Sequence, residues 1–149
     1  NVHEIFEQGS KFNIEGEDYT DSETITRDNK KDPNIPIYRM RHTALYLQDY
    51  NLEIYYSNVG DTPERIKRTT VDLRSDWTEW RGSAPEEILR TEEECEGSHL
   101  PNVSSSGGSS HVRVHQVRDP YIFVEEERKY LIYSVAGETG LGIAELTEA

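Results

Sequence analysis

An internal repeat is the feature that most restricts the possible folds of this chain. Residues 41–57 (RHTALYLQDYNLEIYYS) align without a gap on residues 118–134 (RDPYIFVEEERKYLIYS), at a shift of 118 − 41 = 77 positions. Both copies begin with Arg, carry an apolar run before a polar or charged turn, and end in Tyr-Ser. Repeats of this size predict similar supersecondary units, each of which covers the apolar face of its neighbour.

Each copy is predicted to fold as a series of short antiparallel strands. Aliphatic and aromatic runs alternate with charged turns and glycines, which is typical of a β-meander. Pro120 stands where a strand begins, so it removes no hydrogen bond from the ladder. A fourth, outer strand is expected after the first copy. The expected strands are residues 41–48, 52–57, 64–73 and 86–90 in the first copy and 121–125, 129–134 and 141–146 in the second.

The charge and the cysteine content exclude several classes of protein. A formal net charge of −13 argues against a nucleic-acid partner and against an anionic membrane surface, because both would repel the chain. Cys95 is the single cysteine, which excludes an internal disulfide. The sequence has no apolar run long enough to cross a membrane and no signal peptide. We therefore expect a cytoplasmic location, although a missing N-terminus could hide an export signal.

Four strands per repeat is the composition of a β-propeller blade. We therefore predict an all-β chain of about two blades, a partial propeller that forms a single domain over residues 1–149 with a long irregular N-terminal segment. The expected parts are an outer strand at 1–10, an irregular loop at 11–38, a complete blade at 39–90, an acidic and Ser/Gly-rich loop at 91–117, and an incomplete three-stranded blade at 118–149.

The incomplete second blade predicts self-association. A three-stranded sheet leaves backbone groups unpaired at its edge, where another strand can add. The N-terminal strand could close this edge within the chain or across to another copy, so we expect a homo-oligomer. The alternative is that the boundaries only reflect where the segment begins.

With these residues in view, the chain resembles the five-bladed β-propeller glycosidases, which include the arabinanase, xylosidase and invertase-like groups. The resemblance rests on RDP followed by an apolar strand, a charged turn and a strand ending in Tyr-Ser. From Arg39 to Leu146 the chain looks like the C-terminal part of uncharacterised bacterial proteins of this type. The matching pieces are RMRHTALYL, VGDTPERI, EGSHLP and YSVAGETGLGIAEL. The fold hosts many functions, so the resemblance is more specific for fold than for activity.

The resemblance implies a site at the inner end of each blade. The first strand of a blade lies nearest the propeller axis, so Arg41, His42, Arg118 and Asp119 are expected to face a ligand there. Glycosidases need one protonated and one ionised carboxylate. Similarity to the RDP motif gives Asp119 the role of a carboxylate that stabilises the transition state or tunes a neighbouring acid. The alternatives are that Arg118 pairs with Asp119 to fix the start of the blade and that His42 is structural.

Two glutamates of the acidic loop complete the list of candidate site residues. Glu96 could supply a general acid and Glu94 could bind ligand, unless the loop is only a solvated surface. The acidic residues Glu17, Asp18 and Asp21 match no calcium-loop motif, so we predict no metal site and no cofactor.

About two blades cannot supply all the carboxylates of a propeller glycosidase. We therefore expect a non-catalytic or degenerate glycosidase-like partial propeller that self-associates and has a carbohydrate-binding face. The alternative is a glycoside hydrolase whose active site is completed by another subunit or by a missing N-terminal half. A third possibility is that the chain is a fragment of a longer gene whose function lies elsewhere.

Overall fold

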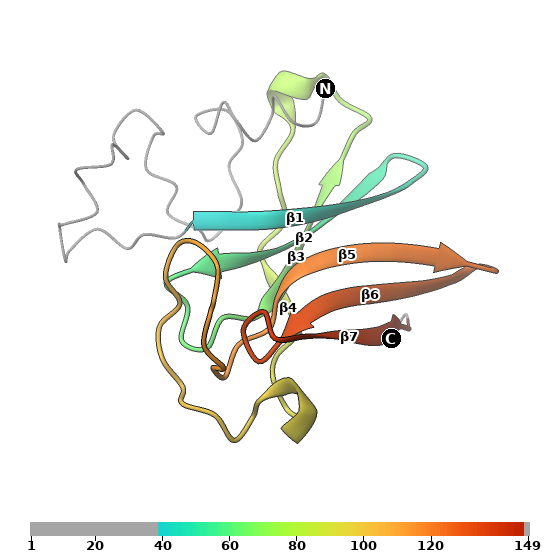
Figure 1. Cartoon of the computed structure of the whole chain (residues 1–149). Helices are drawn as coiled ribbons and strands as arrows, with labels where there is room; N and C mark the ends of the chain where they lie inside the picture. The colour runs from blue at the N-terminus through green and yellow to red at the C-terminus, as the bar shows by residue number, and fades with distance from the viewer. Residues whose placement is uncertain (1–38, 148–149) are drawn as a thin grey trace, which may run out of the picture.

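The computed structural model describes residues 39–147. The outer strand expected at 1–10, the loop at 11–38 and the acidic residues Glu17, Asp18 and Asp21 lie outside these residues. The described part is all-β and forms two antiparallel sheets (Figure 1). Sheet A contains β1 (Arg39–Gln48), β2 (Asn51–Val59), β3 (Ile66–Asp72) and β4 (Glu86–Leu89), and sheet B contains β5 (Arg118–Glu125), β6 (Arg128–Val135) and β7 (Gly140–Leu146).

The seven strands expected from the sequence are all present, and each is paired with its neighbour along the chain. Two-residue turns join β1 to β2 and β5 to β6. Asp49, Glu126 and Glu127 adopt positive φ angles of 54°, 48° and 66° in these turns, the left-handed geometry that matches the twist of a hairpin. Two short 3-10 helices, η2 (Trp77–Glu79) and η3 (Glu94–Glu96), lie in the connections.

The two sheets repeat each other in register as well as in sequence. Arg41 pairs with Ser57 and Arg118 with Ser134, and both first strands carry a β-bulge immediately after the arginine. The shift in the third strands is 75 positions instead of 77, because Ile54 pairs with Thr69 while its equivalent, Leu131, pairs with Ala144 (144 − 69 = 75). The turn before β3 is longer than the turn before β7, which accounts for this difference.

One face of sheet A packs against one face of sheet B, and β5 contacts both β1 and β2 (Figure 1). This core contains Ala44, Tyr55 and Ile66 from sheet A and Leu131, Tyr133 and Val135 from sheet B. Val117, the residue directly before β5, completes it. We call these the inner faces of the two sheets. A second apolar cluster, Leu52, Ile54, Tyr56 and Val71, lies on the outer face of sheet A.

A buried ion pair links the inner faces. Lys129 on β6 donates to Glu53 on β2 over 2.6 Å, and the same ammonium group lies 4.5 Å from the centre of the Tyr46 ring. Burial raises the pKa of Glu53, but hydrogen bonds from Lys129 and Tyr55 outweigh this effect, so the pKa lies below its ordinary value of 4.5. The ion pair therefore fixes how sheet B lies on sheet A.

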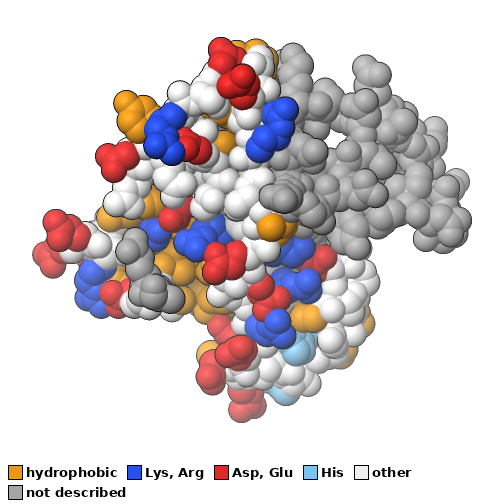
Figure 2. All heavy atoms as spheres, turned by 180° about the vertical axis from the view of Figure 1, so that it is seen from behind, with side chains coloured by type: hydrophobic (Ala, Val, Ile, Leu, Met, Phe, Trp, Pro, Cys, Tyr) orange, Lys and Arg blue, Asp and Glu red, His pale blue; other side chains and the backbone are white. Residues whose placement is uncertain are grey.

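Charges of both signs are interspersed over the face of the molecule in Figure 2. Ion pairs between neighbouring strands include Arg128 with Glu145 and Arg68 with Glu86. Within residues 39–147, no helix is long and apolar enough to cross a membrane.

Candidate functional site

The two bulges place His42 and Asp119 at the same position of their sheets and against each other. His42 has a φ of 45° and Asp119 a φ of 53°. This left-handed geometry is uncommon for residues other than glycine, and it costs about 1–3 kcal/mol for each residue. Nδ1 of His42 lies 3.2 Å from Oδ1 of Asp119. Bulges redirect side chains, and here both copies of the repeat direct one toward the junction of the sheets.

Four charged side chains form a network next to these two residues. They belong to Arg41, Glu64, Arg118 and Glu138. Glu64 is fully buried, with Oε1 lying 3.6 Å from Nε of Arg41 and Oε2 lying 3.9 Å from Nε of Arg118. Glu138 also faces both guanidinium groups, at 3.1 Å from Arg118 and 3.6 Å from Arg41. Ser57 donates to Glu64 over 2.6 Å. The two equivalent arginines and the two glutamates thus form one network between the sheets.

A pocket of about 420 Å³ opens above this network. Its lining comes from the starts of β1 and β5, from the Ser/Gly-rich loop and from the turn before β7. The lining residues are Met40, Arg41, His42, Val59, Gly108, Ser109, Asp119 and Glu138.

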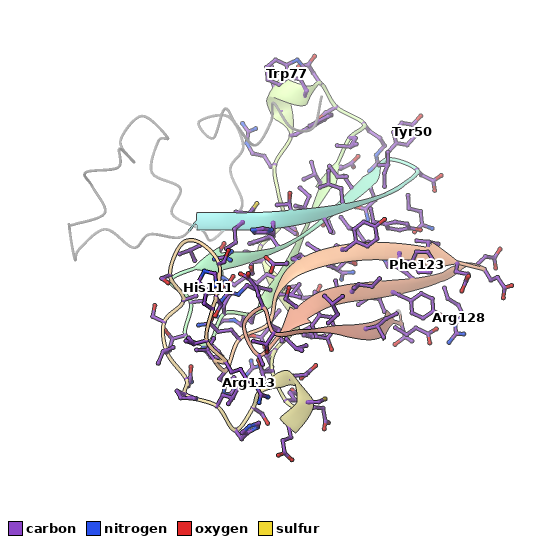
Figure 3. All side chains as sticks on the ribbon, viewed as in Figure 1. Tyr50, Trp77, His111, Arg113, Phe123 and Arg128 are labelled. Carbon is purple, nitrogen blue, oxygen red and sulfur yellow. The ribbon has the colours of Figure 1, made fainter. Side chains whose placement is uncertain are left out.

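The Ser/Gly-rich loop forms a wall of the pocket because it is hydrogen-bonded along its length. Arg41 donates to the carbonyl groups of Ser106 and Gly108. Ser104 donates to the carbonyl of Gly60, and Glu138 accepts from the amide of Ser110. Figure 3 shows His111 on this loop. Arg41 therefore contacts the buried carboxylate of Glu64, the partly exposed carboxylate of Glu138 and the loop.

Four of the six predicted site residues meet here. Arg41, His42 and Asp119 line the pocket, while Arg118 is buried beneath it and donates to Gln116 over 2.7 Å and to Glu138. Asp119 accepts a hydrogen bond from Ser134 through Oδ2 over 2.8 Å. Its buried Oδ1 lies 3.2 Å from Nδ1 of His42 but accepts no hydrogen bond from residues 39–147. The expected pairing of Arg118 with Asp119 is replaced by pairing of each with other residues.

The two predicted glutamates of the acidic loop are not among the residues that line this pocket. Glu96 accepts hydrogen bonds from the Tyr133 hydroxyl and from the amides of Glu92 and Glu93. Burial raises the pKa of Glu96, but these three donors outweigh it, so its pKa is lowered, whereas burial and the bond to Glu96 raise the pKa of Tyr133. These bonds fix η3 against sheet B. The catalytic role of Glu96 and the ligand-binding role of Glu94 stay predictions.

Two acidic residues of the site were missed by the sequence reasoning. The repeat contains a signal for Glu138, because Gly60-Asp61 and Gly137-Glu138 are equivalent pairs that follow the second strand of each copy. Glu64 had no such signal. It stands in a run with three basic residues, Arg65, Lys67 and Arg68, and only the packing of the sheets shows that it lies between Arg41 and Arg118.

The site is rich in both hydrogen-bond donors and acceptors and is nearly balanced in charge. Two guanidinium groups face three carboxylates, with an imidazole whose side chain is 60% exposed at the rim. Among the described residues, no group of three or more His, Cys, Asp or Glu side chains is arranged to hold a metal ion. The arrangement can bind a polar ligand that both donates and accepts hydrogen bonds.

The chain is similar to an uncharacterised protein of Acanthamoeba polyphaga mimivirus, with 44% identity over 108 residues. The matched region is 72% of this chain and 30% of the viral protein, so the chain spans less than a third of the length of this relative. No family model matches the chain, and no solved structure matches it. The relative is viral, so it gives no support to the bacterial origin expected from the resemblance.

Proposed function

We propose that this chain is a non-catalytic binding module made of two adjacent propeller-type blades, and that its pocket binds a neutral, hydroxyl-rich ligand such as a carbohydrate. The observation that carries this proposal is the meeting of His42 and Asp119. Two copies of the repeat adopt the same strained backbone geometry and bring their side chains to 3.2 Å at the pocket. Strain of this kind is concentrated at functional sites.

The blade part of the proposal is supported by the order of the strands. Each sheet is an antiparallel meander, and β5, the first strand of sheet B, contacts β1, the first strand of sheet A. This is the arrangement expected of two blades beside a common axis. The viral relative is much longer than the matched region, so further blades of the same kind fit such a protein.

The chemistry of the lining favours a neutral polyol over an ion. A sugar hydroxyl both donates and accepts, so it can accept from Arg41 and donate to Asp119 Oδ1, which has His42 Nδ1 at 3.2 Å but accepts no hydrogen bond from the described residues. An anion would be repelled by three nearby carboxylates, and a cation by two guanidinium groups. Met40 and Val59 supply the apolar contact that a sugar ring needs.

Binding is favoured over catalysis because of where the carboxylates lie. Glycoside hydrolysis requires a carboxylic acid that is protonated before reaction, usually in an apolar environment. Glu64 and Glu138 each face two guanidinium groups, and Asp119 faces His42 and accepts from Ser134. Each of the three carboxylates therefore has charged or hydrogen-bonding partners and lacks the apolar surroundings that such an acid uses.

Binding can be tested by calorimetry and ligand-observed NMR with a panel of neutral mono- and oligosaccharides. We expect saturable binding of at least one sugar, weakened roughly tenfold or more in Asp119→Asn and in His42→Ala. The exposed Asp72→Asn at the end of β3 is the control and should leave affinity unchanged. Absence of binding across the panel, or equal binding by the Asp119→Asn protein, would contradict the proposal.

A glycoside hydrolase is the second candidate, because Asp119 and Glu138 line one pocket. In that case the remaining catalytic groups come from another subunit or from a part of the protein outside this sequence. Hydrolysis of a nitrophenyl glycoside that is lost in both Asp119→Asn and Glu138→Gln would favour this candidate over simple binding. Sugar binding without turnover would favour the binding module.

A further inference from the structure

The Tyr-Ser pair in the second strand of each copy places a buried hydroxyl group beside each bulge. Ser57 and Ser134 are equivalent at the 77-residue shift. In the ladders, Ser57 lies opposite Arg41, and Ser134 lies opposite Arg118, so each serine is next to the point where the register shifts. Ser57 is fully buried and Ser134 is 8% exposed. Neither serine is among the residues that line the pocket, so any effect on a ligand must pass through another side chain.

Both hydroxyl groups donate to a carboxylate, but the two carboxylates come from different parts of the chain. Ser134 donates to Oδ2 of Asp119 over 2.8 Å, and Asp119 stands in the bulge of the same sheet. The bulge of sheet A holds His42 at the equivalent position. Ser57 instead donates over 2.6 Å to Oε1 of Glu64, which belongs to the connection between β2 and β3. The same position of the repeat therefore orients one carboxylate in each sheet.

The bond from Ser134 gives the two oxygens of Asp119 different neighbours. Oδ2 accepts from the serine, while the buried Oδ1 lies 3.2 Å from Nδ1 of His42 and accepts no hydrogen bond from residues 39–147. The bulge sets the direction of the Cα–Cβ bond. The carboxyl group then turns about a broad, two-fold torsion, so a donor fixed on one oxygen determines where the other oxygen lies.

We propose that Ser134 is a positioning residue of the binding site, which holds Asp119 so that Oδ1 receives a hydroxyl group of the ligand. This inference rests on the proposed function, because it assigns a role within the same pocket. Ser134 does not touch the ligand, since its hydroxyl group is engaged by Asp119. A carboxylate that is already oriented loses less side-chain freedom on binding, and the ligand is therefore held more tightly.

The equivalent serine of sheet A shows what a purely structural role looks like. Ser57 holds the oxygen of Glu64 that lies 3.6 Å from Nε of Arg41. Glu64 is fully buried and is not among the residues that line the pocket. Loss of the Ser57 hydroxyl group should therefore lower stability through the buried network and leave the carboxyl group of Asp119 where it is.

The test compares three substitutions at Ser134 in the whole chain. Ser134→Ala removes the hydroxyl group, whereas Ser134→Thr keeps it and Ser134→Val has the shape of the threonine variant without it. Carbon NMR of a chain labelled at the aspartate carboxyl groups reports on Asp119, whose resonance is assigned by its loss in Asp119→Asn. We expect this resonance to move in the alanine and valine variants and to stay close to its original position in the threonine variant.

Affinity for a sugar that the unmodified chain binds is the second measurement. It should weaken roughly threefold to tenfold in Ser134→Ala and Ser134→Val, and Ser134→Thr should restore it. Ser75→Ala, at an exposed serine after β3, is the control and should leave affinity unchanged. Circular dichroism should show the same strand content in all variants. The comparison of threonine with valine isolates the hydroxyl group even if the alanine variant folds poorly.

Two results would overturn the proposal, and they differ from failure of the proposed function. An Asp119 resonance that is the same in the threonine and valine variants would show that Ser134 does not orient the carboxyl group, whether or not a sugar binds. Equal sugar affinity of these two variants would show that the orientation does not matter for binding, while the pocket would still be a sugar site. In Ser57→Ala the Asp119 resonance should stay in place, and a shift as large as in Ser134→Ala would mean that the signal reports only loosened packing.

Discussion

Arg41 and Arg118 hold opposite oxygens of one buried carboxylate, that of Glu64. The two arginines are equivalent positions of the repeat, and each begins the bulge that places His42 or Asp119 at the pocket. Glu138 faces the same two guanidinium groups from the opposite sheet. The ion network therefore couples the geometry of the pocket to the packing of the sheets.

Removal of Glu64 should be strongly destabilising. Glu64→Ala leaves two poorly exposed guanidinium groups with Glu138 as their remaining charged partner within residues 39–147, and loss of one member of a buried network costs about 3–5 kcal/mol. Glu64→Gln keeps the shape and one acceptor and should cost less. The free energy of unfolding in urea gives both values. Glu86→Gln, at an exposed ion pair with Arg68, is the control and should change stability by less than about 1 kcal/mol. An equally small effect of Glu64→Ala would show that the network contributes little.

The contact between Glu53 and Lys129 should make stability depend on pH. The pKa of Glu53 is lowered in the folded state, so the folded state gains stability above the ordinary pKa of 4.5 and loses it as the pH falls through the folded value. The pKa of Glu96 is also lowered in the folded state, so Glu96 contributes to stability over the same range of pH. Urea unfolding between pH 7 and about pH 3.5 should therefore show falling stability, and Glu53→Gln should reduce the slope.

Lys129→Met is the complementary change at this contact. It removes the largest factor that lowers the pKa of Glu53 and leaves its burial in place. We expect a loss of about 1–3 kcal/mol at pH 7 and a loss of stability that begins at a higher pH than in the unmodified chain. An unchanged pH profile in this variant would contradict the assignment of the shift to Lys129.

Two substitutions at His42 should separate backbone strain from side-chain function. His42→Gly removes the imidazole and also relieves the left-handed backbone, which costs an ordinary residue roughly 1–2 kcal/mol. His42→Ala removes the imidazole and keeps the strain. We expect the glycine variant to be more stable than the alanine variant by about 1 kcal/mol, with sugar binding weakened equally in both. Equal stability of the two variants would show that the backbone strain is relieved in some other way.

Gly142 should not tolerate a side chain. A Cβ atom at this position would lie 2.6 Å from Cζ of Tyr133, and this ring is fixed by its hydrogen bond to Glu96. Gly142→Ala should cost about 1–3 kcal/mol in the free energy of unfolding. Gly107→Ala in the Ser/Gly-rich loop meets no atom within 4 Å and should be nearly neutral. A neutral Gly142→Ala would mean that the Tyr133 ring can move away without losing its bond.

The repeat and the period-2 patterns were enough to predict the secondary structure. Strand alternation and turn residues are local properties, so the seven strands and the all-β class follow from them. The grouping of Arg41, His42, Arg118 and Asp119 was also predictable, because equivalent positions of stacked repeats lie side by side. Propeller closure is not tested by two sheets, and it stays a prediction.

The sequence by itself therefore determined the strands, the repeat and the arginine-led motif that begins each copy. Only the tertiary structure decided which charges meet. Glu64 and Glu138 join Arg41 and Arg118 because one face of sheet A is buried against sheet B, where each guanidinium group must find a carboxylate. Glu96 instead accepts a hydrogen bond from the Tyr133 hydroxyl. Contacts between residues far apart in the chain depend on how two faces pack, and no local pattern of residues encodes that packing.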